Sequence, residues 1–247
     1  MIVATEPEQL RDVRYGTRGR IALIVPYDNA VIEPELAMAL PDGVTGNVLR
    51  IIKCPPDAMV TTALTLAGQA PYLGARAVLY CCVASVCLQG VTEDEAFCRE
   101  LSAKAQLPAR SATASMVDAL HAIGARRPAL LLPYPEPKCL AVRRYFAAHG
   151  FEVVGDHRLG LEPEAINDLS PRDVFEAARR VPTAGADSLL LVSTNLPTLE
   201  ALPHLQRLSP IPVLSTNAAL AWNGLRLLGL VPAHMPEGRV MDAIGQA

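Results

Sequence analysis

Short apolar runs alternate with longer amphipathic segments along almost the whole chain. Seven of these runs have the length and β-branched or aliphatic content typical of strands. They are Arg20–Val25, Asn47–Lys53, Ala75–Cys82, Pro128–Leu132, Glu152–Arg158, Asp187–Ser193 and Ile211–Ser215. Several are apolar on consecutive residues, which is typical of parallel strands that are covered on both faces.

Helical periodicity fills the intervals between these strands. The segments are Glu33–Leu40, Asp57–Tyr72, Glu93–Ala105, Ser115–Ile123, Pro137–His149, Arg172–Val181, Thr198–Leu208 and Ala218–Leu228. Because strands and helices alternate in this way, the pattern predicts an α/β fold with parallel sheets.

The chain also contains a weak internal repeat. Ile21–Asn29 (IALIVPYDN) and Ala129–Pro137 (ALLLPYPEP) are both a strand followed by Pro-Tyr, and ARAVLYCCVAS and ADSLLLVSTNL follow them at about the same distance. Two βαβ halves related by a pseudo-twofold axis would meet at a cleft, with Cys82 and Ser193 on opposite walls. The alternative is that the repeat has no special meaning, because all proteins built from βαβ units look similar to themselves at this level of detail.

Composition narrows the class of protein. The 247 residues are 51% hydrophobic and carry a net charge of −3. The sequence has no cluster of basic residues, so we do not expect it to bind nucleic acid. The N-terminus has no signal-peptide pattern, and no apolar run is long enough to cross a bilayer. We therefore expect a soluble, cytoplasmic protein in which the six cysteines are thiols.

Cys82 differs from the other cysteines in its position, because it ends a strand just before an expected helix N-terminus. Backbone N–H groups and the helix dipole there would lower the thiol pKa from about 8.5 toward neutrality. Buried cysteines are otherwise inert small hydrophobes. We expect Cys54, Cys81, Cys98 and Cys139 to be inert residues of this kind. Cys87 lies in the expected loop and could be either an inert residue or a reactive thiol.

Other chemistries lack their sequence signatures. The five histidines are scattered, and none has metal-ligand spacing to a Cys or Asp, so we expect no metal. Glycine-rich dinucleotide and phosphate loops are absent, as is the G-x-S-x-G elbow of serine hydrolases. We expect no cofactor.

Five motifs occur in the order and spacing of a known superfamily. They are GRIALIVPYDNAVIEPE, VLYCCVASVCLQG, RSATASMVDALHAIGARRPALLLPY, LLLVSTNLPTLEAL and IPVLSTNAALAWNGLRLLG. Together they resemble the Asp/Glu racemase superfamily, most of all its maleate cis-trans isomerase and arylmalonate decarboxylase branch.

The resemblance implies two similar α/β halves and cofactor-free chemistry in the cleft between them. It implies a first half of residues 1–107 plus 215–247 and a second half of residues 108–214, because the last helix returns to the first half in this family. Cys82 matches the first family cysteine. Asn29 and Tyr134 match carboxylate-binding residues, and Asn167 matches a further family Asn, although Glu164 competes for that position.

The departures from the family pattern select among its activities. The second family cysteine falls on Ser193, whose hydroxyl is too weak an acid for two-base racemisation. The decarboxylase uses Thr-Ser hydroxyls at the positions of Val83 and Ala84, and its catalytic thiol is the second one. The resemblance therefore favours a maleate isomerase-like enzyme.

The mechanism expected on this basis is addition of the Cys82 thiolate to a small unsaturated dicarboxylate. Backbone amides at Val83–Val86 and Ser193–Asn195, the latter including Thr194, would stabilise the charge, and Ser193 or a water would relay a proton. We also expect a homo-oligomer.

Alternatives remain open for both the function and the residues. The chain could be a racemase or decarboxylase of an α-substituted acid, or a catalytically silent binding protein for a small acid. Asn29 could simply cap a helix. Tyr134 could be a core residue, and Ser193 and Thr194 could be caps.

Overall fold

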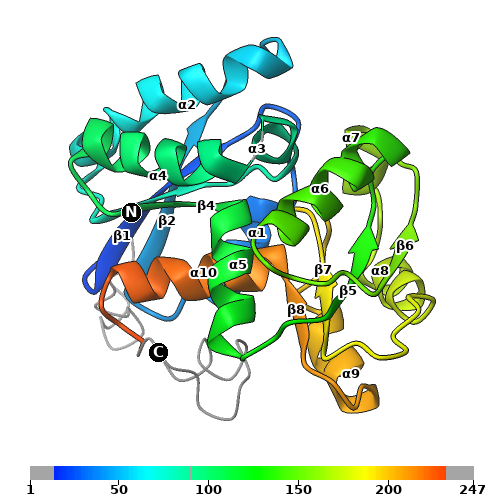
Figure 1. Ribbon diagram of the computed structural model, residues 1–247. Helices are drawn as coiled ribbons and strands as arrows, with labels where there is room; N and C mark the ends of the chain where they lie inside the picture. The colour runs from blue at the N-terminus through cyan, green and yellow to red at the C-terminus, as the bar shows by residue number, and fades with distance from the viewer. Residues whose placement is uncertain (1–13, 90, 232–247) are drawn as a thin grey trace, which may run out of the picture.

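A computed structural model describes residues 14–89 and 91–231, which form two four-stranded parallel sheets (Figure 1). The first sheet has the order β2-β1-β3-β4 and the second the order β6-β5-β7-β8. Their strands are β1 (Gly19–Val25), β2 (Val44–Arg50), β3 (Ala77–Tyr80), β4 (Ala109–Ser111), β5 (Pro128–Leu132), β6 (Gly155–Arg158), β7 (Ser188–Leu191) and β8 (Val213–Ser215). The matching strand orders confirm the predicted α/β fold of two similar halves.

Helices connect successive strands in both halves. They are α1 (Ile32–Ala39), α2 (Met59–Ala67), α3 (Ala84–Gln89), α4 (Val91–Ala105), α5 (Ala112–Ala122), α6 (Glu136–Ala148), α7 (Pro163–Asn167), α8 (Pro171–Ala178), α9 (Ala201–Leu208) and α10 (Thr216–Leu227). Two 3-10 turns, Pro56–Ala58 and Ala70–Leu73, flank α2, so the helix predicted over Asp57–Tyr72 is shorter than its pattern indicates.

The two central strands of each sheet are almost completely buried. In β3, β5 and β7 every residue is buried, and in β1 only Arg20 is exposed. Helices cover both faces of these strands, and this explains their consecutive apolar residues. The edge strands β2 and β6 are more exposed and more polar.

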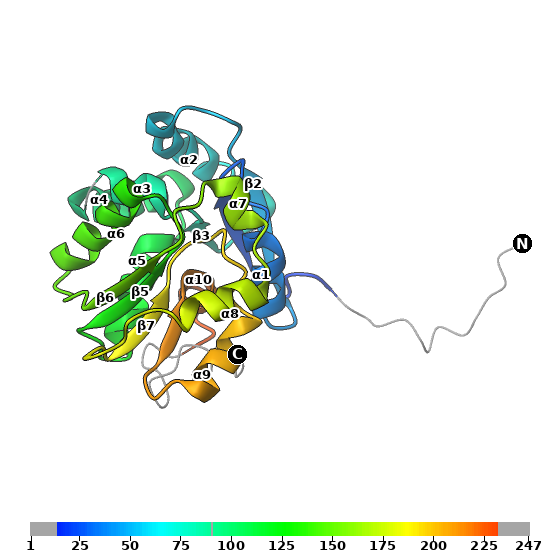
Figure 2. The same ribbon diagram turned by 90° about the vertical axis from the view of Figure 1, so that its right-hand side faces the viewer.

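Figure 1 shows α2 and α4 on one side of the first sheet and α5 and α10 on the other. Figure 2 shows α6 on one side of the second sheet and α8 and α9 on the other.

Helix α10 contacts α1, α5, β3 and β4, although it follows β8 in the chain. The first sheet includes β4 and therefore extends past the boundary expected at residue 107. No helix in the described parts of the chain is long and apolar enough to cross a membrane.

The strand orders determine where a ligand can enter. Within each sheet, the connections from the two central strands run to opposite sides, so their C-terminal loops separate and leave a crevice. In the first half these loops follow β1 and β3, and in the second they follow β5 and β7. They carry Asn29, Cys82, Tyr134 and Ser193, respectively.

Candidate active site

A cavity of about 160 Å³ lies where the C-terminal loops of the two halves meet. The first half contributes residues around Asp28 and Cys82, and the second contributes Tyr134, Lys138 and Asn195. This volume is smaller than the roughly 300–1,000 Å³ of sites for drug-sized ligands. The cavity therefore suits a ligand of only a few heavy atoms.

Cys82 is the cysteine that lines this cavity, and it lies between the end of β3 and the start of α3. The residue is 9% exposed, and Ser85 and Tyr80 lie beside its sulfur, where they favour the thiolate form. The Tyr80 and Ser85 hydroxyls lie 2.7 Å apart. This set of donors matches a thiolate better than a thiol.

The pKa of Cys82 is nevertheless raised, mainly because burial disfavours the charged thiolate, and nearby Asp28 adds to the effect. The lowered pKa predicted from the helix N-terminus is therefore wrong. Strand-end position is visible in the sequence, but the depth at which the residue is buried is not. The donors around the sulfur lower the pKa by less than burial raises it.

The pH dependence of thiol alkylation tests this direction. Below the raised pKa most Cys82 is neutral, and the reactive thiolate increases tenfold with each pH unit until that pKa is passed. We expect the rate of Cys82 alkylation by iodoacetamide to be still rising at pH 9, as followed by peptide mass spectrometry with free cysteine as the reference. A rate that levels off at or below pH 7 would contradict a burial-raised pKa.

Tyr134 and Ser193 meet on the second-half side of the cavity. Tyr134 follows β5, is 7% exposed, and lies near enough to Ser193 for that side chain to affect its pKa. Its pKa is raised by burial, so its hydroxyl is a neutral donor. Tyr134 is also close enough to Cys82 for the thiolate to raise its pKa further, which links the two predicted catalytic positions through one hydroxyl.

Ser193 has a strained backbone. Its φ is +148°, a region that L-residues rarely adopt and that costs about 1–3 kcal/mol. Two bonds hold this conformation: its N–H donates to Thr216 Oγ1 at 3.0 Å, and its Oγ accepts from the Asn195 N–H at 3.0 Å. Ser193 is fully buried and lies behind the residues that line the cavity. Stored strain of this kind is typical of functional loops.

Asn29 and Asn167 join the two halves around the same loop. Asn29 Oδ1 accepts from the N–H groups of Val31 and Ile32 at 2.9 and 3.0 Å, so it stabilises the turn that leads into α1, although the N-cap residue itself is Val31. Its Nδ2 donates to Thr194 Oγ1 at 3.0 Å and Asn195 Oδ1 at 3.1 Å.

Asn167 makes the complementary contacts from the end of α7. It donates to the Asp28 carbonyl at 2.6 Å and accepts from Asn195 Nδ2 at 3.0 Å. Thr194 and Asn195 line the cavity, and so do Val83 and Ala84, whereas Asn29 and Asn167 stand behind that lining. Glu164, the competing residue, is exposed on α7.

Glu35 is a buried carboxylate that the sequence pattern does not single out. It lies on α1, is 6% exposed, and accepts hydrogen bonds from Thr198 Oγ1 (3.0 Å), Leu199 N–H (2.8 Å) and Asn217 Nδ2 (2.7 Å). These partners belong to the loop after Ser193–Asn195 and to α10. Glu35 therefore fixes the far end of the strained loop to the first half.

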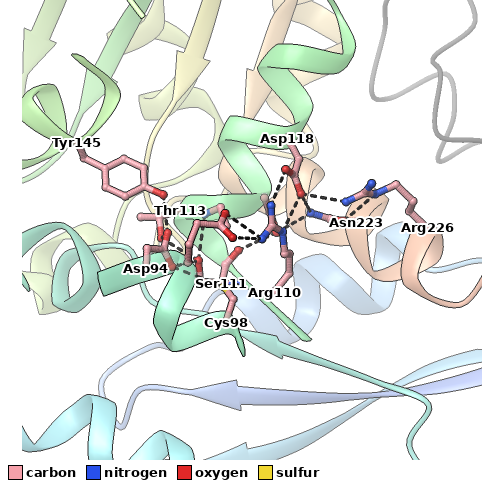
Figure 3. A network of polar contacts seen from close by, with 12 residues as sticks. Asp94, Cys98, Arg110, Ser111, Thr113, Asp118, Tyr145, Asn223 and Arg226 are labelled. Carbon is pink, nitrogen blue, oxygen red and sulfur yellow. Dashed lines mark hydrogen bonds and ion pairs between the residues drawn. The ribbon is translucent and has the colours of Figure 1, made fainter. Parts of the chain in front are cut away.

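A second buried network surrounds Asp94 (Figure 3). Asp94 on α4 accepts from Ser111 and Thr113, each at 2.6 Å, and from the Tyr145 hydroxyl. Figure 3 shows Tyr145 reaching Asp94 from α6, the helix that follows Tyr134. The contact ties α6 of the second half to the first half and so helps to fix the width of the cavity.

The structure also brings two charged residues to the cavity that the sequence did not indicate. Asp28 follows β1, and Lys138 lies in the first turn of α6. Asp28 immediately precedes Asn29, which belongs to the family motif. No sequence pattern distinguishes Lys138 from the other lysines on helices. Within residues 14–89 and 91–231, no three His, Cys, Asp or Glu side chains gather in a way that could hold a metal ion.

Comparisons with known proteins agree with this geometry. The chain is 27% identical over 242 residues to the maleate isomerase of Nocardia farcinica, covering 90% of this chain and 95% of the relative. It is 26% identical over 231 residues to the arylmalonate decarboxylase of Bordetella bronchiseptica, covering 89% and 92%.

A solved structure of the Nocardia farcinica maleate cis-trans isomerase superposes with a TM-score of 0.79 at 25% identity, over 87% of this chain and 96% of that one. That protein is a variant in which a cysteine is replaced by serine, and it carries a covalently bound succinyl-cysteine intermediate. The family model described as arylmalonate decarboxylase matches residues 21–241. The chain therefore belongs to the arylmalonate decarboxylase family.

Proposed function

We propose that the chain is a cofactor-independent cis-trans isomerase of a small unsaturated dicarboxylate such as maleate, with Cys82 as its nucleophile. The observation that carries this proposal is a thiol, surrounded by hydrogen-bond donors, on the wall of a cavity sized for a small acid. The succinyl-cysteine of the Nocardia farcinica enzyme supports a covalent route.

In the first step the Cys82 thiolate forms a C–S bond to one alkene carbon. The π electron pair moves to the second carbon and its carboxylate. Val83 and Ala84 stand at the start of α3, where backbone N–H groups lack intrahelical acceptors and are free to stabilise that charge. A proton delivered through Ser193 or a water then completes a succinyl adduct.

The adduct has a single bond where the alkene was, so the two carboxylates can rotate past each other. Loss of the added proton and expulsion of the Cys82 thiolate restore the double bond as the trans isomer. No electrons are gained or lost overall. Tyr134, Thr194 and Asn195 contact the carboxylates, while Asn29 and Asn167 hold Asn195 in position.

Proton NMR in deuterated water tests the function directly. Maleate, arylmalonates, alkylmalonates, hydantoins and amino acids are incubated in turn with the protein, because isomerisation, decarboxylation and α-proton exchange give different spectra. We expect maleate to convert to fumarate and intact-protein mass spectrometry to detect an adduct of one diacid on Cys82. Turnover of another class without isomerisation would contradict the proposal.

Replacing Ser193 with cysteine separates thiol addition from two-base racemisation. The change keeps side-chain size nearly constant, and cysteine faces the same strained φ as serine. It introduces a thiol with an ordinary pKa of about 8.5 in place of a far weaker acid. We expect isomerisation to change less than the roughly 10²–10⁴-fold that a general acid–base contributes, with slow α-proton exchange appearing. A large gain of racemase activity, with no isomerase activity in either form, would overturn the assignment.

Decarboxylation is the second candidate, and the raised pKa of Cys82 favours it. In that reaction the bond to one carboxyl group breaks, carbon dioxide leaves, and the electron pair remains as an enediolate. A neutral Cys82 thiol would then donate its proton to carbon. The absence of hydroxyls at Val83 and Ala84 counts against this candidate, and arylmalonate in the NMR screen tests it.

A further inference from the structure

Lys138 is a cation on the wall of the candidate active site, and the mechanism above makes no use of it. The charged side chains among the described residues that line the cavity are Lys138 and Asp28. The Lys138 ammonium lies 3.8 Å from a Glu162 carboxylate oxygen, and the Glu162 side chain is 68% exposed. Exposed ion pairs of this kind contribute little to stability. Glu162 therefore competes weakly for the ammonium when an anion enters the cavity.

The helix that carries Lys138 is fixed on the side nearest the cavity. The Lys138 N–H donates to the Pro135 carbonyl at 3.1 Å, and Cys139 Sγ donates to the Tyr134 carbonyl at 3.0 Å. Farther along α6, Tyr145 binds buried Asp94. The start of α6 therefore holds the Lys138 backbone in place relative to Tyr134, and the Lys138 side chain reaches the cavity from the second half.

Asp28 and Lys138 line the same cavity, near enough for the Lys138 charge to affect the pKa of Asp28. Burial raises the pKa of Asp28, nearby Glu164 raises it further, and Lys138 and Arg50 lower it. The same Asp28 carboxylate raises the pKa of Cys82. An anionic substrate group beside Asp28 is thus repelled, whereas one beside Lys138 is attracted.

We propose that Lys138 is a specificity-determining residue that binds the second carboxylate of a dianionic substrate, a role that rests on the isomerase function proposed above. One carboxylate lies next to the carbon that Cys82 attacks, and the other pairs with the Lys138 ammonium. Asp28 repels a carboxylate placed beside it, so the favourable contact for the second carboxylate is the Lys138 ammonium. The site thereby selects small dicarboxylates over acids with one carboxylate.

Binding of unreactive ligands tests Lys138 without turnover. Succinate and succinamate have nearly the same shape, but an uncharged carboxamide replaces one carboxylate in succinamate. We expect Lys138→Gln to weaken succinate binding about 10- to 100-fold, the range for a hydrogen bond to a charged group, and to leave succinamate nearly unchanged. Lys138→Arg should retain most of the affinity, and Asp28→Asn should strengthen succinate binding.

Lys104→Gln is the matched control, because it removes the same charge from an exposed position on α4. Calorimetric titration measures binding, and KM for maleate against its monoamide repeats the comparison under turnover. Three results would overturn the role of Lys138. They are an equal loss of affinity for the two ligands in Lys138→Gln, a comparable loss of succinate affinity in Lys104→Gln, and no succinate binding by the unmodified protein. If Lys138→Gln discriminates between the two ligands but maleate is not isomerised, the charge selectivity stands and the isomerase function fails.

Discussion

Replacing Cys82 with alanine is expected to lower the rate of maleate isomerisation by roughly 10³-fold or more, because loss of a covalent nucleophile removes the whole addition pathway. Cys82→Ser is expected to behave similarly, since a serine hydroxyl stays protonated far above neutral pH. Conversion of maleate to fumarate, followed by NMR, measures the rate. Intact-protein mass spectrometry should detect no diacid adduct in either variant.

Both Cys82 variants should keep the fold. Each change removes or replaces one sulfur atom, which corresponds to a destabilisation of about 1 kcal/mol and should leave the circular dichroism spectrum unchanged. Cys54→Ala is the control, because Cys54 is a partly exposed thiol outside the cavity lining. A folded Cys82→Ala protein that retains even about a tenth of the activity would show that another group is the nucleophile.

Replacing Glu35 with alanine is expected to lower the free energy of unfolding by about 3 kcal/mol. The carboxylate satisfies a backbone N–H, a hydroxyl and an amide in a buried site, and each donor left unpaired costs about 1–3 kcal/mol. The burial that raises the pKa of Glu35 also makes its charged form less favourable, and this offsets part of the loss. Urea unfolding measures the difference.

Glu176→Ala is the matched control for Glu35, because Glu176 is an exposed carboxylate whose ion pair among the described residues is with Arg179 three positions later. It should lower the free energy of unfolding by no more than about 0.5 kcal/mol. If the two alanine variants were equally stable, the buried contacts of Glu35 would not hold the strained loop. Loss of that anchor should also slow isomerisation, since Ser193–Asn195 lie at the near end of the same loop.

The charge of Glu35 gives its contribution a defined pH dependence. Because the pKa of Glu35 is raised in the folded protein, the folded state binds this proton more tightly than the unfolded chain does. The stabilisation from Glu35 is therefore largest below the unfolded value of about 4.3 and declines as pH rises through the folded pKa. Glu35→Gln removes that decline, so its stability relative to the parent protein should increase between about pH 4 and the raised pKa.

Local sequence was sufficient to predict the strands that form the centre of each sheet. The run Pro128–Leu132 is a strand with the predicted bounds, because five consecutive apolar residues can be buried only where helices cover both faces. Strand β4 was missed because it is three residues long and contains Arg110, whose charge is balanced by Asp118 and Glu95. The short helices α3 and α7 were missed for the same reason: too few residues to display a helical period.

The sequence alone also indicated Cys82, because the end of a strand is a property of the local pattern. Burial depth is not a local property, so only the tertiary structure determined that the thiol pKa is raised. Glu33 and Glu35 look alike on one helix, yet packing against the second half buries only Glu35. Lys138 is likewise distinguished only by the meeting of two halves that are distant in sequence. The residue types and the alternation of strands with helices were readable from the chain, but which charges face each other across the cavity depended on long-range contacts.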